Sequence, residues 1–550
     1  MTKHICRLCL LLSVLLFALF PEKTFAHASI IRSSPGVNEV LPNPPSAVKI
    51  QFNEPVQAGF HSLKILDSSG KQVNLTSAQL NSHNDAILEA HLKKKLSRGA
   101  YSLQWKAVSA DGHPVEGVIP FAVGTGGEQA PKINEKSNDY FPRTDMIILR
   151  GMLYLSFSLF IGVIIFNLFF NKFEGRETLK TIHTKSMTIL WFSLSGMVFS
   201  IVLSLPMQTT LYAGVSWAKV FNASLLKDTI SQTGFGLYWI FQMLFLVLLI
   251  LVTYIAAGNG FTKKSWFVPI VIYIGLLLSK ASTGHTAASG HRVVTVIMDF
   301  IHLLAASIWI GGLFALILLL PSIRSQKNDG DRQLYWNSIR TFSLWAALSV
   351  AGIIITGIYG SLLYVPTFYS LLHTYYGYAL LGKILLFVLM LILGTVHFFK
   401  GRKQGKNGIV YSIWIELLTG AAIMVIAAIL TNLPAAVSTP GPFSQIKEHG
   451  KYDVSLHISP NVEGENSFYI AINTTDGKPA VQIEQVILTF THTKMNMGES
   501  SVAVPRISPG KYQTKSMYMN MPGEWKVDIH VLTKSLDSFD VEFDAFTGSQ

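Results

Sequence analysis

The sequence predicts a multidomain protein with an N-terminal immunoglobulin-like, Greek-key β-sandwich, a bundle of eight transmembrane α-helices and a small C-terminal β-sandwich. Of the 550 residues, 50% are hydrophobic and only 14% are charged, a composition too apolar for a soluble protein. The long apolar stretches are confined to the middle of the chain. The regions before and after them show short alternating runs, which are typical of strands.

Residues 1–26 are predicted to be a secretory signal peptide. Lys3 and Arg7 precede an apolar run, and small residues near Ala26 form a cleavage site. Cleavage there leaves His27 as the first residue. Both cysteines of the chain lie inside this segment, so the processed protein has neither a disulfide nor a thiolate metal site.

Residues 27–125 are predicted to form the first β-sandwich. Polar and apolar residues alternate in runs such as 48–52 and 101–105, and Pro- or Gly-containing turns separate the runs. A polar linker is expected at 126–144. A second linker at 435–450 leads to another β-patterned domain at 451–550.

Residues 145–434 are predicted to form the membrane domain. Each of its apolar stretches is about 20 residues long, enough to span a bilayer, although the fourth is short. The stretches lie near 147–170, 187–205, 237–257, 266–280, 293–320, 341–363, 377–399 and 411–433.

The charge pattern predicts the orientation of these helices. Every second loop is rich in Lys and Arg, which is typical of loops on the cytoplasmic side. Because the helix count is even, both flanking domains are expected on the extracytoplasmic side of the plasma membrane. The net charge of +12 is then largely a topology signal, and neither a nucleic-acid partner nor a nucleotide is expected. The basic residues of these loops are Lys172, Arg176, Lys180, Lys185, Lys263, Lys264, Arg324, Lys327, Arg332, Arg340, Lys400, Arg402, Lys403 and Lys406.

A histidine at the N-terminus of the processed chain is a metal chelator. Its free amine and its ring nitrogen bind one ion together, and such nitrogen ligands suit Cu(II). Asp111 and His113 supply a carboxylate and a third nitrogen, and residues two apart on a strand face the same side.

The same region resembles the CopC family of copper-binding proteins. The resemblance implies that His27, Asp111 and His113 hold Cu(II). A second, Met-rich Cu(I) site found in some members is not expected, because residues 27–123 contain no methionine. The matching motifs are His27-Ala28-Ser29, Ser33-Ser34-Pro35, Phe52-Asn53-Glu54-Pro55-Val56 and the run from Val108 to Gly117.

The membrane part resembles CopD, and CopC–CopD fusions are known as YcnJ-type copper transport proteins. The motifs are Gly284-His285, the run from Asp299 to Leu313, Gly357-Ile358-Tyr359-Gly360 and Leu381-Gly382-Lys383.

Ionisable residues inside a span are costly, so they are functional candidates. Asp299 and His302 share a helix face, with His302 about 13 Å deep, and they continue a copper path from His285 and His291 in the preceding loop. Lys383 lies at the same depth as Asp299, about 9 Å, so the two are expected to pair. A purely structural Asp–Lys pair is the alternative. Arg150 and Glu416 lie near the ends of their spans and are interpreted as interface anchors.

The C-terminal domain contains a cluster of soft ligands. Alternation on strands predicts common faces for the methionines, and thioethers with one imidazole suit Cu(I). Packing of these methionines in the core is the alternative. The region loosely resembles YtkA-like domains. The candidate ligands are His492, Met495, Met497, Met517, Met519 and Met521.

Together these features predict a non-enzymatic copper transport protein that captures Cu(II) outside the cell and passes copper to a transmembrane conduit for uptake. Copper ions, the lipid bilayer and other copper chaperones are the expected partners. Outward-facing domains are also compatible with export. A histidine-brace oxidative enzyme and a membrane haem protein are the alternatives from other functional classes.

Overall fold

A computed structural model of the chain describes residues 28, 30–36, 38–52, 55–73, 75–109, 114–124, 142–170, 177–283, 292–319, 329–402, 409–493, 499–520 and 522–549. For residues 170, 177–179, 292, 318–319, 329–338, 396–402 and 409–413 it describes the backbone alone. The predicted signal peptide and most of the first predicted linker lie outside the described residues.

The N-terminal domain is a β-sandwich of two sheets, which confirms the fold expected for this region. One sheet has the strand order β1-β3-β7-β6 and the other β2-β9-β8-β4-β5. All pairings are antiparallel except that of β2 with β9. Alternate residues such as Val48, Ile50 and Phe52 point into the core between the sheets. The strands are β1(Ile30–Ser34), β2(Glu39–Leu41), β3(Ala47–Phe52), β4(Ser62–Asp67), β5(Gln72–Val73), β6(Gln79–Asn81), β7(Asn84–His91), β8(Gly99–Val108) and β9(Pro114–Val123).

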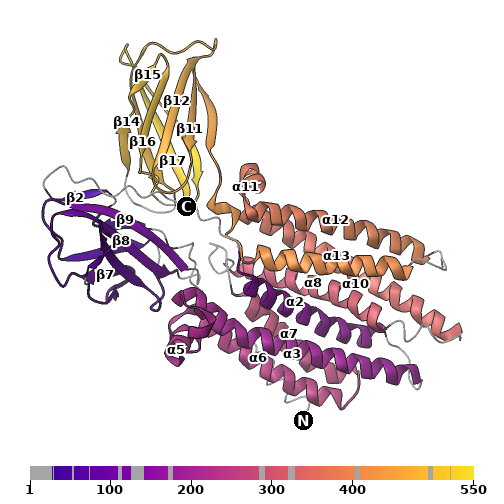
Figure 1. The fold of residues 1–550 in the computed structure, drawn as a ribbon. Helices are drawn as coiled ribbons and strands as arrows, with labels where there is room; N and C mark the ends of the chain where they lie inside the picture. The colour runs from indigo at the N-terminus through magenta and orange to yellow at the C-terminus, as the bar shows by residue number, and fades with distance from the viewer. Residues whose placement is uncertain are drawn as a thin grey trace.

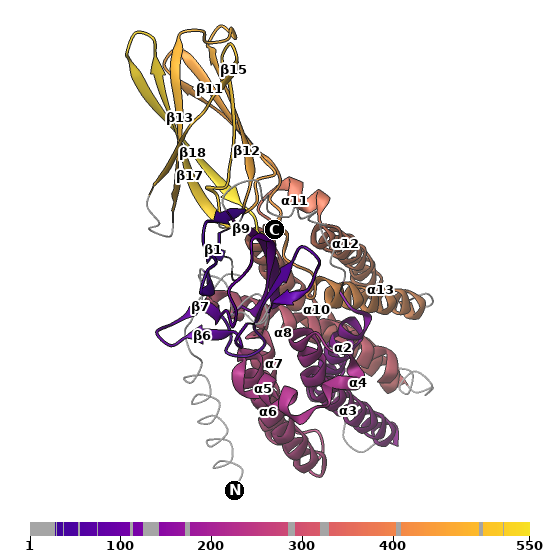
Figure 2. The same cartoon turned by 60° about the vertical axis from the view of Figure 1, so that its left-hand side comes forward.

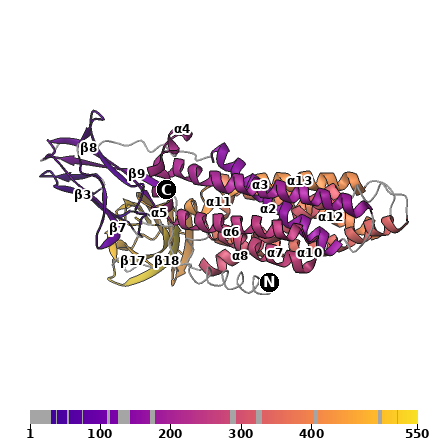
Figure 3. The ribbon, with the colours of Figure 1, turned by 90° about the horizontal axis from the view of Figure 1, so that it is seen from below.

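Eight long helices form the central bundle, in agreement with the prediction (Figure 1). Within the described residues, seven of them are long and apolar enough to cross a membrane. The eighth, α13, has 22 residues, and its apolar part is Trp414–Leu430. Seen from below, the helices run side by side along one direction (Figure 3). The long helices are α2(Thr144–Ile165), α3(Glu177–Ala213), α6(Gly234–Ala257), α7(Lys263–Ala281), α8(Arg292–Leu319), α10(Asp329–Tyr364), α12(Tyr375–Arg402) and α13(Ile409–Leu430).

Several helical segments were not foreseen. Helices α3 and α10 have 37 and 36 residues and extend beyond the predicted spans, because the flanking sequence is polar yet helix-forming. Three short helices, α4(Trp217–Val220), α5(Ala223–Gln232) and α11(Phe368–His373), lie at the end of the bundle next to the β-domains (Figure 3). Helix α5 is amphipathic and has a low mean hydropathy, so its sequence does not resemble a membrane span. Two short elements complete the bundle, the π-helical turn η1(Phe166–Phe170) and the 3-10 turn η3(Ala436–Ser438).

Helix α2 is the centre of the bundle and packs against α3, α8 and α13. In its most apolar stretch of 18 residues, 72% of the residues are buried. The corresponding share is 17% in α10 and 11% in α12. The backbones of α2 and α8 touch where Gly162 meets Gly311, and a Cβ atom on either glycine would overlap the backbone of the other helix. Small residues permit such close approach between membrane helices.

This contact predicts that Gly311→Val destabilises the bundle. The added side chain would overlap the carbonyl of Ser158, so α2 and α8 would have to separate. We expect the free energy of unfolding, measured in mixed micelles, to fall by about 3 kcal/mol. As a control, Gly360→Ala adds a methyl group in open space and should change the free energy by less than about 1 kcal/mol. Equal effects of the two substitutions would contradict the packing described.

The C-terminal domain is a second β-sandwich, as predicted. Its sheets have the strand orders β10-β11-β12-β16-β15 and β14-β13-β17-β18. Buried residues such as Leu456, Ile470 and Val527 alternate along the strands and fill the core. The strands are β10(Phe443–His449), β11(Tyr452–Ser459), β12(Asn466–Thr474), β13(Ile483–His492), β14(Ser500–Ala503), β15(Arg506–Ser508), β16(Lys511–Ser516), β17(Gly523–Thr533) and β18(Ser538–Thr547).

Both β-domains lie at the same end of the helical bundle, as the even number of helices predicts (Figures 1 and 2). They also contact each other, because Ile31 of β1 packs against the core of the C-terminal domain. The C-terminal domain contacts the bundle where the Thr367 hydroxyl donates a hydrogen bond to the Pro440 carbonyl, at 2.7 Å.

Candidate functional site

The residues next to the predicted Cu(II) ligands lie close together. His27, Asp111 and His113 themselves are outside the described residues, the last two between β8 and β9. The Ala28 amide donates a hydrogen bond to the Ser109 hydroxyl at 3.3 Å, and both residues are buried. The chain following His27 therefore runs beside the chain that leads to Asp111.

The same part of the N-terminal domain rests on the helical bundle. Ser109 forms a β-bridge with Val56, and the Gln57 amide donates to the Val108 carbonyl at 2.7 Å. The side-chain oxygen of Gln57 accepts a hydrogen bond of 3.2 Å from the Gly234 amide, at the start of α6. Nearby, the rings of Phe60 and Tyr212 lie 5.6 Å apart. The segment Val56–Gln57, which pairs with the residues preceding Asp111, is thus also the segment that contacts the bundle.

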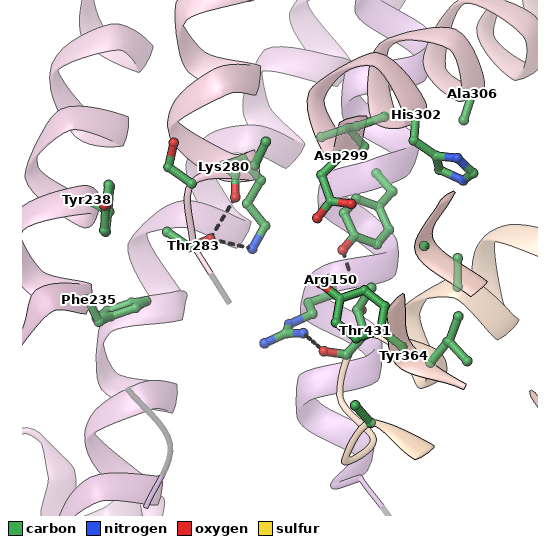
Figure 4. Close-up of a pocket in the computed structure, with 18 of the residues that line it drawn as sticks. Arg150, Phe235, Tyr238, Lys280, Thr283, Asp299, His302, Ala306, Tyr364 and Thr431 are labelled. Carbon is green, nitrogen blue, oxygen red and sulfur yellow. Dashed lines mark hydrogen bonds between the residues drawn. The ribbon is translucent and has the colours of Figure 1, made fainter. Parts of the chain in front are cut away.

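A cavity of about 930 Å³ begins at this contact and extends into the bundle. Its outer wall includes Val56, Gln57 and Asp85 of the N-terminal domain. Its inner wall is formed by residues of α2, α7, α8, α10, α12 and α13, among them Asp299 and His302. Figure 4 shows the side chains of Arg150, Lys280 and Asp299 around this space.

Helix α8 presents Asp299 and His302 to the cavity from successive turns, as the sequence predicts. Asp299 is exposed, but the surface that it exposes faces the cavity. The His302 ring is half-buried and passes close to Gly357 of α10, where a Cβ atom would lie 3.9 Å from it.

Hydrogen bonds define which ring nitrogen of His302 carries the lone pair that can bind a metal. The Thr356 hydroxyl donates to the Gly352 carbonyl at 2.7 Å, so it accepts from His302 Nδ1–H at 2.8 Å. Nε2 therefore carries the lone pair, and the Lys383 ammonium donates to it at 3.2 Å. Lys383 was expected to pair with Asp299. Its hydrogen bond is to His302 instead, and Asp299 acts on it electrostatically.

Two further cations line the cavity and were not assigned to it from the sequence. Lys280, near the end of α7, donates to the Thr283 hydroxyl at 3.2 Å. Arg150 of α2 was interpreted as an interface anchor, but it lines the cavity and donates to the Thr431 carbonyl. The rule that singled out Asp299, that an ionisable residue within a span is functional, also applies to these two residues.

Two thioethers also line the cavity. Met390 of α12 and Met424 of α13 are both buried there. Met390 comes seven residues after Lys383, or roughly 10 Å further along α12. Methionines are ordinary in apolar helices, so nothing in the sequence distinguishes these two.

The other predicted ligands of the helical region lie outside the described residues. His285 and His291 are in the segment between α7 and α8, which the structure does not describe. Glu416 was interpreted from the sequence as an interface anchor and not as a ligand, but it is buried in α13, with an exposed fraction of 4%.

In the C-terminal domain, the predicted common face of Met517 and Met519 is not formed. Strand β16 ends at Ser516, so strand alternation does not continue through them. Met517 is 45% exposed, whereas Met519 is fully buried in the core, where its sulfur accepts a hydrogen bond from the Thr547 hydroxyl at 3.9 Å. Met495, Met497 and Met521 lie outside the described residues.

His492 lies at the same end of this domain as Met519. It is buried, and its ring meets the Trp525 indole edge-on at a centroid distance of 5.1 Å. The His492 ring lies close to Gly523, because a Cβ atom on Gly523 would be 2.9 Å from His492 Nε2. Gly523 in turn pairs across the sheet with Thr547, whose hydroxyl donates to the Met519 sulfur.

Comparison with known protein families divides the chain into four matching segments. Residues 30–124 match the CopC domain, and residues 143–294 match the N-terminal domain of copper resistance protein D-like proteins. Residues 336–430 match copper resistance protein D, and residues 446–530 match the YtkA-like family. The copper transport protein CutJ of Bacillus subtilis is 38% identical over 96% of this chain and 98% of its own length. The chain belongs to the CopC–CopD family of copper transport proteins.

Other members of the family match single parts. Copper resistance protein D of Pseudomonas syringae is 26% identical over 52% of this chain and 94% of its own length. The crystal structure of CopC from Methylosinus trichosporium OB3b is 31% identical and covers 18% of this chain and 94% of that chain, with a TM-score of 0.17. The family matches and the relative from Bacillus subtilis confirm the resemblance inferred from the sequence motifs, and the protein is a multi-pass membrane protein of copper transport or resistance.

Proposed function

We propose that this protein takes up copper across the plasma membrane. Cu(II) binds outside the cell to the His27 amine and ring, Asp111 and His113, and then passes through the cavity to Asp299 and His302. Membership of a family whose relative is named a copper transport protein supports the cargo. Imidazole, amine and carboxylate groups suit Cu(II).

One observation carries this proposal. The cavity that contains Asp299 and His302 begins at Val56 and Gln57, which pair with the residues leading to Asp111. Copper that leaves the N-terminal domain on this side enters the cavity directly. Transfer between adjoining sites needs no diffusion of free metal through solution.

At His302, copper replaces a side-chain cation. The lone pair of Nε2 is the one that ligates a metal, and the Lys383 ammonium occupies it in the structure. Copper therefore binds His302 by displacing Lys383, while Asp299, one turn away, offers a carboxylate. Thr356 holds the ring through Nδ1, as is usual for metal-ligating histidines.

Two thioethers, Met390 and Met424, also line the cavity, and Met390 is the one that lies deeper than His302. His285 and His291 are proposed as ligands at the outer entrance. His492 with Met495, Met497 and Met521 of the C-terminal domain is proposed as a Cu(I) store at the same end of the molecule, which other copper chaperones would load, whereas Met519 belongs to the core of that domain.

The direction follows from the proposed orientation. Placing both β-domains outside the cell puts the basic loops in the cytoplasm, as membrane insertion favours. Domains that bind copper outside the cell and adjoin a membrane cavity are suited to capture, which favours uptake.

Blocking the cavity tests the route. Ala306→Phe places a ring in the cavity, whereas Ala347→Phe adds the same ring to an exposed position of α10 that is not part of the cavity wall. In vesicles that contain the full chain with its β-domains outside, we expect copper uptake by wild type and Ala347→Phe, and loss of roughly nine-tenths of the rate in Ala306→Phe. Equal uptake by the two variants, or uptake only in vesicles of the opposite orientation, would overturn the proposal.

A further inference from the structure

The charge of the cavity does not suit a bare copper ion. The helical part of its wall carries three basic residues, Arg150, Lys280 and Lys383, and one carboxylate, Asp299. The second carboxylate, Asp85, belongs to the N-terminal domain at the outer end. With the ordinary charges of these side chains, the helical part has an excess of two positive charges.

The surroundings of the two lysines do not neutralise them. Lys280 donates to the hydroxyl of Thr283, and Lys383 donates to the neutral ring of His302. Among the described residues, neither lysine forms an ion pair with a carboxylate. Asp299 interacts electrostatically with both of them, but one carboxylate balances only one cation. Buried cations are retained where they serve a function or meet a counter-charge.

The cavity is also far larger than a metal ion requires. Its volume is about 930 Å³, whereas sites for small organic molecules have about 300–1,000 Å³ and a water molecule needs about 30 Å³. Apolar side chains such as Leu303, Trp309 and Phe387 cover part of the wall, as in sites for organic ligands. The buried Tyr364 hydroxyl, which also lines the cavity, has no hydrogen-bond partner among the described residues.

We propose that the cavity binds a small organic anion with two or more carboxylate groups, which enters together with copper. Arg150 and Lys280 bind its carboxylates near the outer end, and Tyr364 donates a hydrogen bond to it. When copper displaces Lys383 from His302, the freed ammonium meets the same anion. The cargo is then a copper–carboxylate pair, whose net charge suits the cavity better than that of copper alone. This inference rests on the proposed function in one respect, namely that copper passes through the same cavity.

Anion binding is measurable without copper. The probe is citrate, added to the metal-free full chain in detergent while thermal unfolding is followed. We expect a saturable rise in Tm for wild type and for the control Lys264→Gln, whose side chain is exposed in the first turn of α7 and is not part of the cavity wall. Arg150→Gln and Lys280→Gln should lose the rise, and Lys280→Arg should retain it because the charge is kept.

Other anions test the chemical class. Succinate should act like citrate, and inorganic phosphate should give less than half of the rise because it leaves the apolar wall uncovered. No saturable rise with either carboxylate, an undiminished rise in both glutamine variants, or an equal rise with phosphate would overturn the proposal.

The link to copper has its own measurement. In vesicles with the free copper concentration held constant by a buffer, citrate should raise the rate of copper uptake roughly fivefold or more. An unchanged rate would overturn the claim that the anion enters with copper. Absence of copper uptake under all conditions, with citrate binding intact, would instead refute the proposed function and leave the anion site standing.

Discussion

Insertion of one alanine between Ala26 and His27 should abolish high-affinity binding of Cu(II) to the N-terminal domain. The inserted residue takes the free amine away from His27, so one ion no longer receives both the amine and the ring nitrogen of the same residue. A loss of about 3 kcal/mol corresponds to a Kd that rises roughly 100-fold. The measurement is a Cu(II) titration of the processed full chain, followed by electron paramagnetic resonance to count the nitrogen ligands.

The matched control leaves the N-terminus unchanged. His83 is exposed, and its ring bonds to the neighbouring Ser82 hydroxyl, so His83→Ala removes a histidine of the same domain at another place. We expect the Kd and the resonance spectrum of this variant to match those of wild type. Equal binding with and without the inserted alanine would show that the N-terminal histidine is not the ligand.

The second large effect is expected in the membrane. His302→Ala removes the imidazole that faces the cavity and should lower copper uptake in vesicles roughly 100-fold. Thr356→Val removes the acceptor of the Nδ1 hydrogen bond, so the ring loses its fixed orientation and uptake should fall by about 10-fold. Thr356→Ser keeps the hydroxyl and should restore most of the rate.

The control for this series is another histidine of the bundle. His373 of α11 stacks on Tyr369 at a centroid distance of 4.0 Å and is not part of the cavity wall. His373→Ala should transport copper at the wild-type rate. A Thr356→Ser variant as slow as Thr356→Val would argue against the orienting role of the hydroxyl.

Much of the fold follows from local sequence patterns. Hydropathy and alternation identify the two sandwiches and the long helices, because the residues of a buried face are apolar and recur at regular intervals in the sequence. The short helices that were missed, α4, α5 and α11, are too short to span a membrane, and α5 is also too polar. Their helical structure depends on packing against the neighbouring helices and the N-terminal domain, which local patterns do not record.

The candidate site was predictable only in part. Asp299 and His302 share one helix face, so their spacing alone brings them together. Lys280, Arg150, Met390 and Met424 come from four other helices, and only the packing of those helices makes them neighbours of one cavity. The partner of Lys383 could not be read from depth, since Asp299 and His302 differ in depth by a single helical turn.

The contact between Gly162 and Gly311 bears on how the cavity opens to the other side of the membrane. Since the backbones of α2 and α8 touch there, we expect these two helices to move as one unit. Helix α12, which carries Lys383 and Met390, is by contrast the least buried of the seven spans. Half of the proposed copper path thus belongs to the tightly packed α2–α8 pair at the centre of the bundle, and half to the exposed helix α12. Rocking of α12 against the α2–α8 pair would pull Lys383 away from His302 and expose Met390 in the same movement.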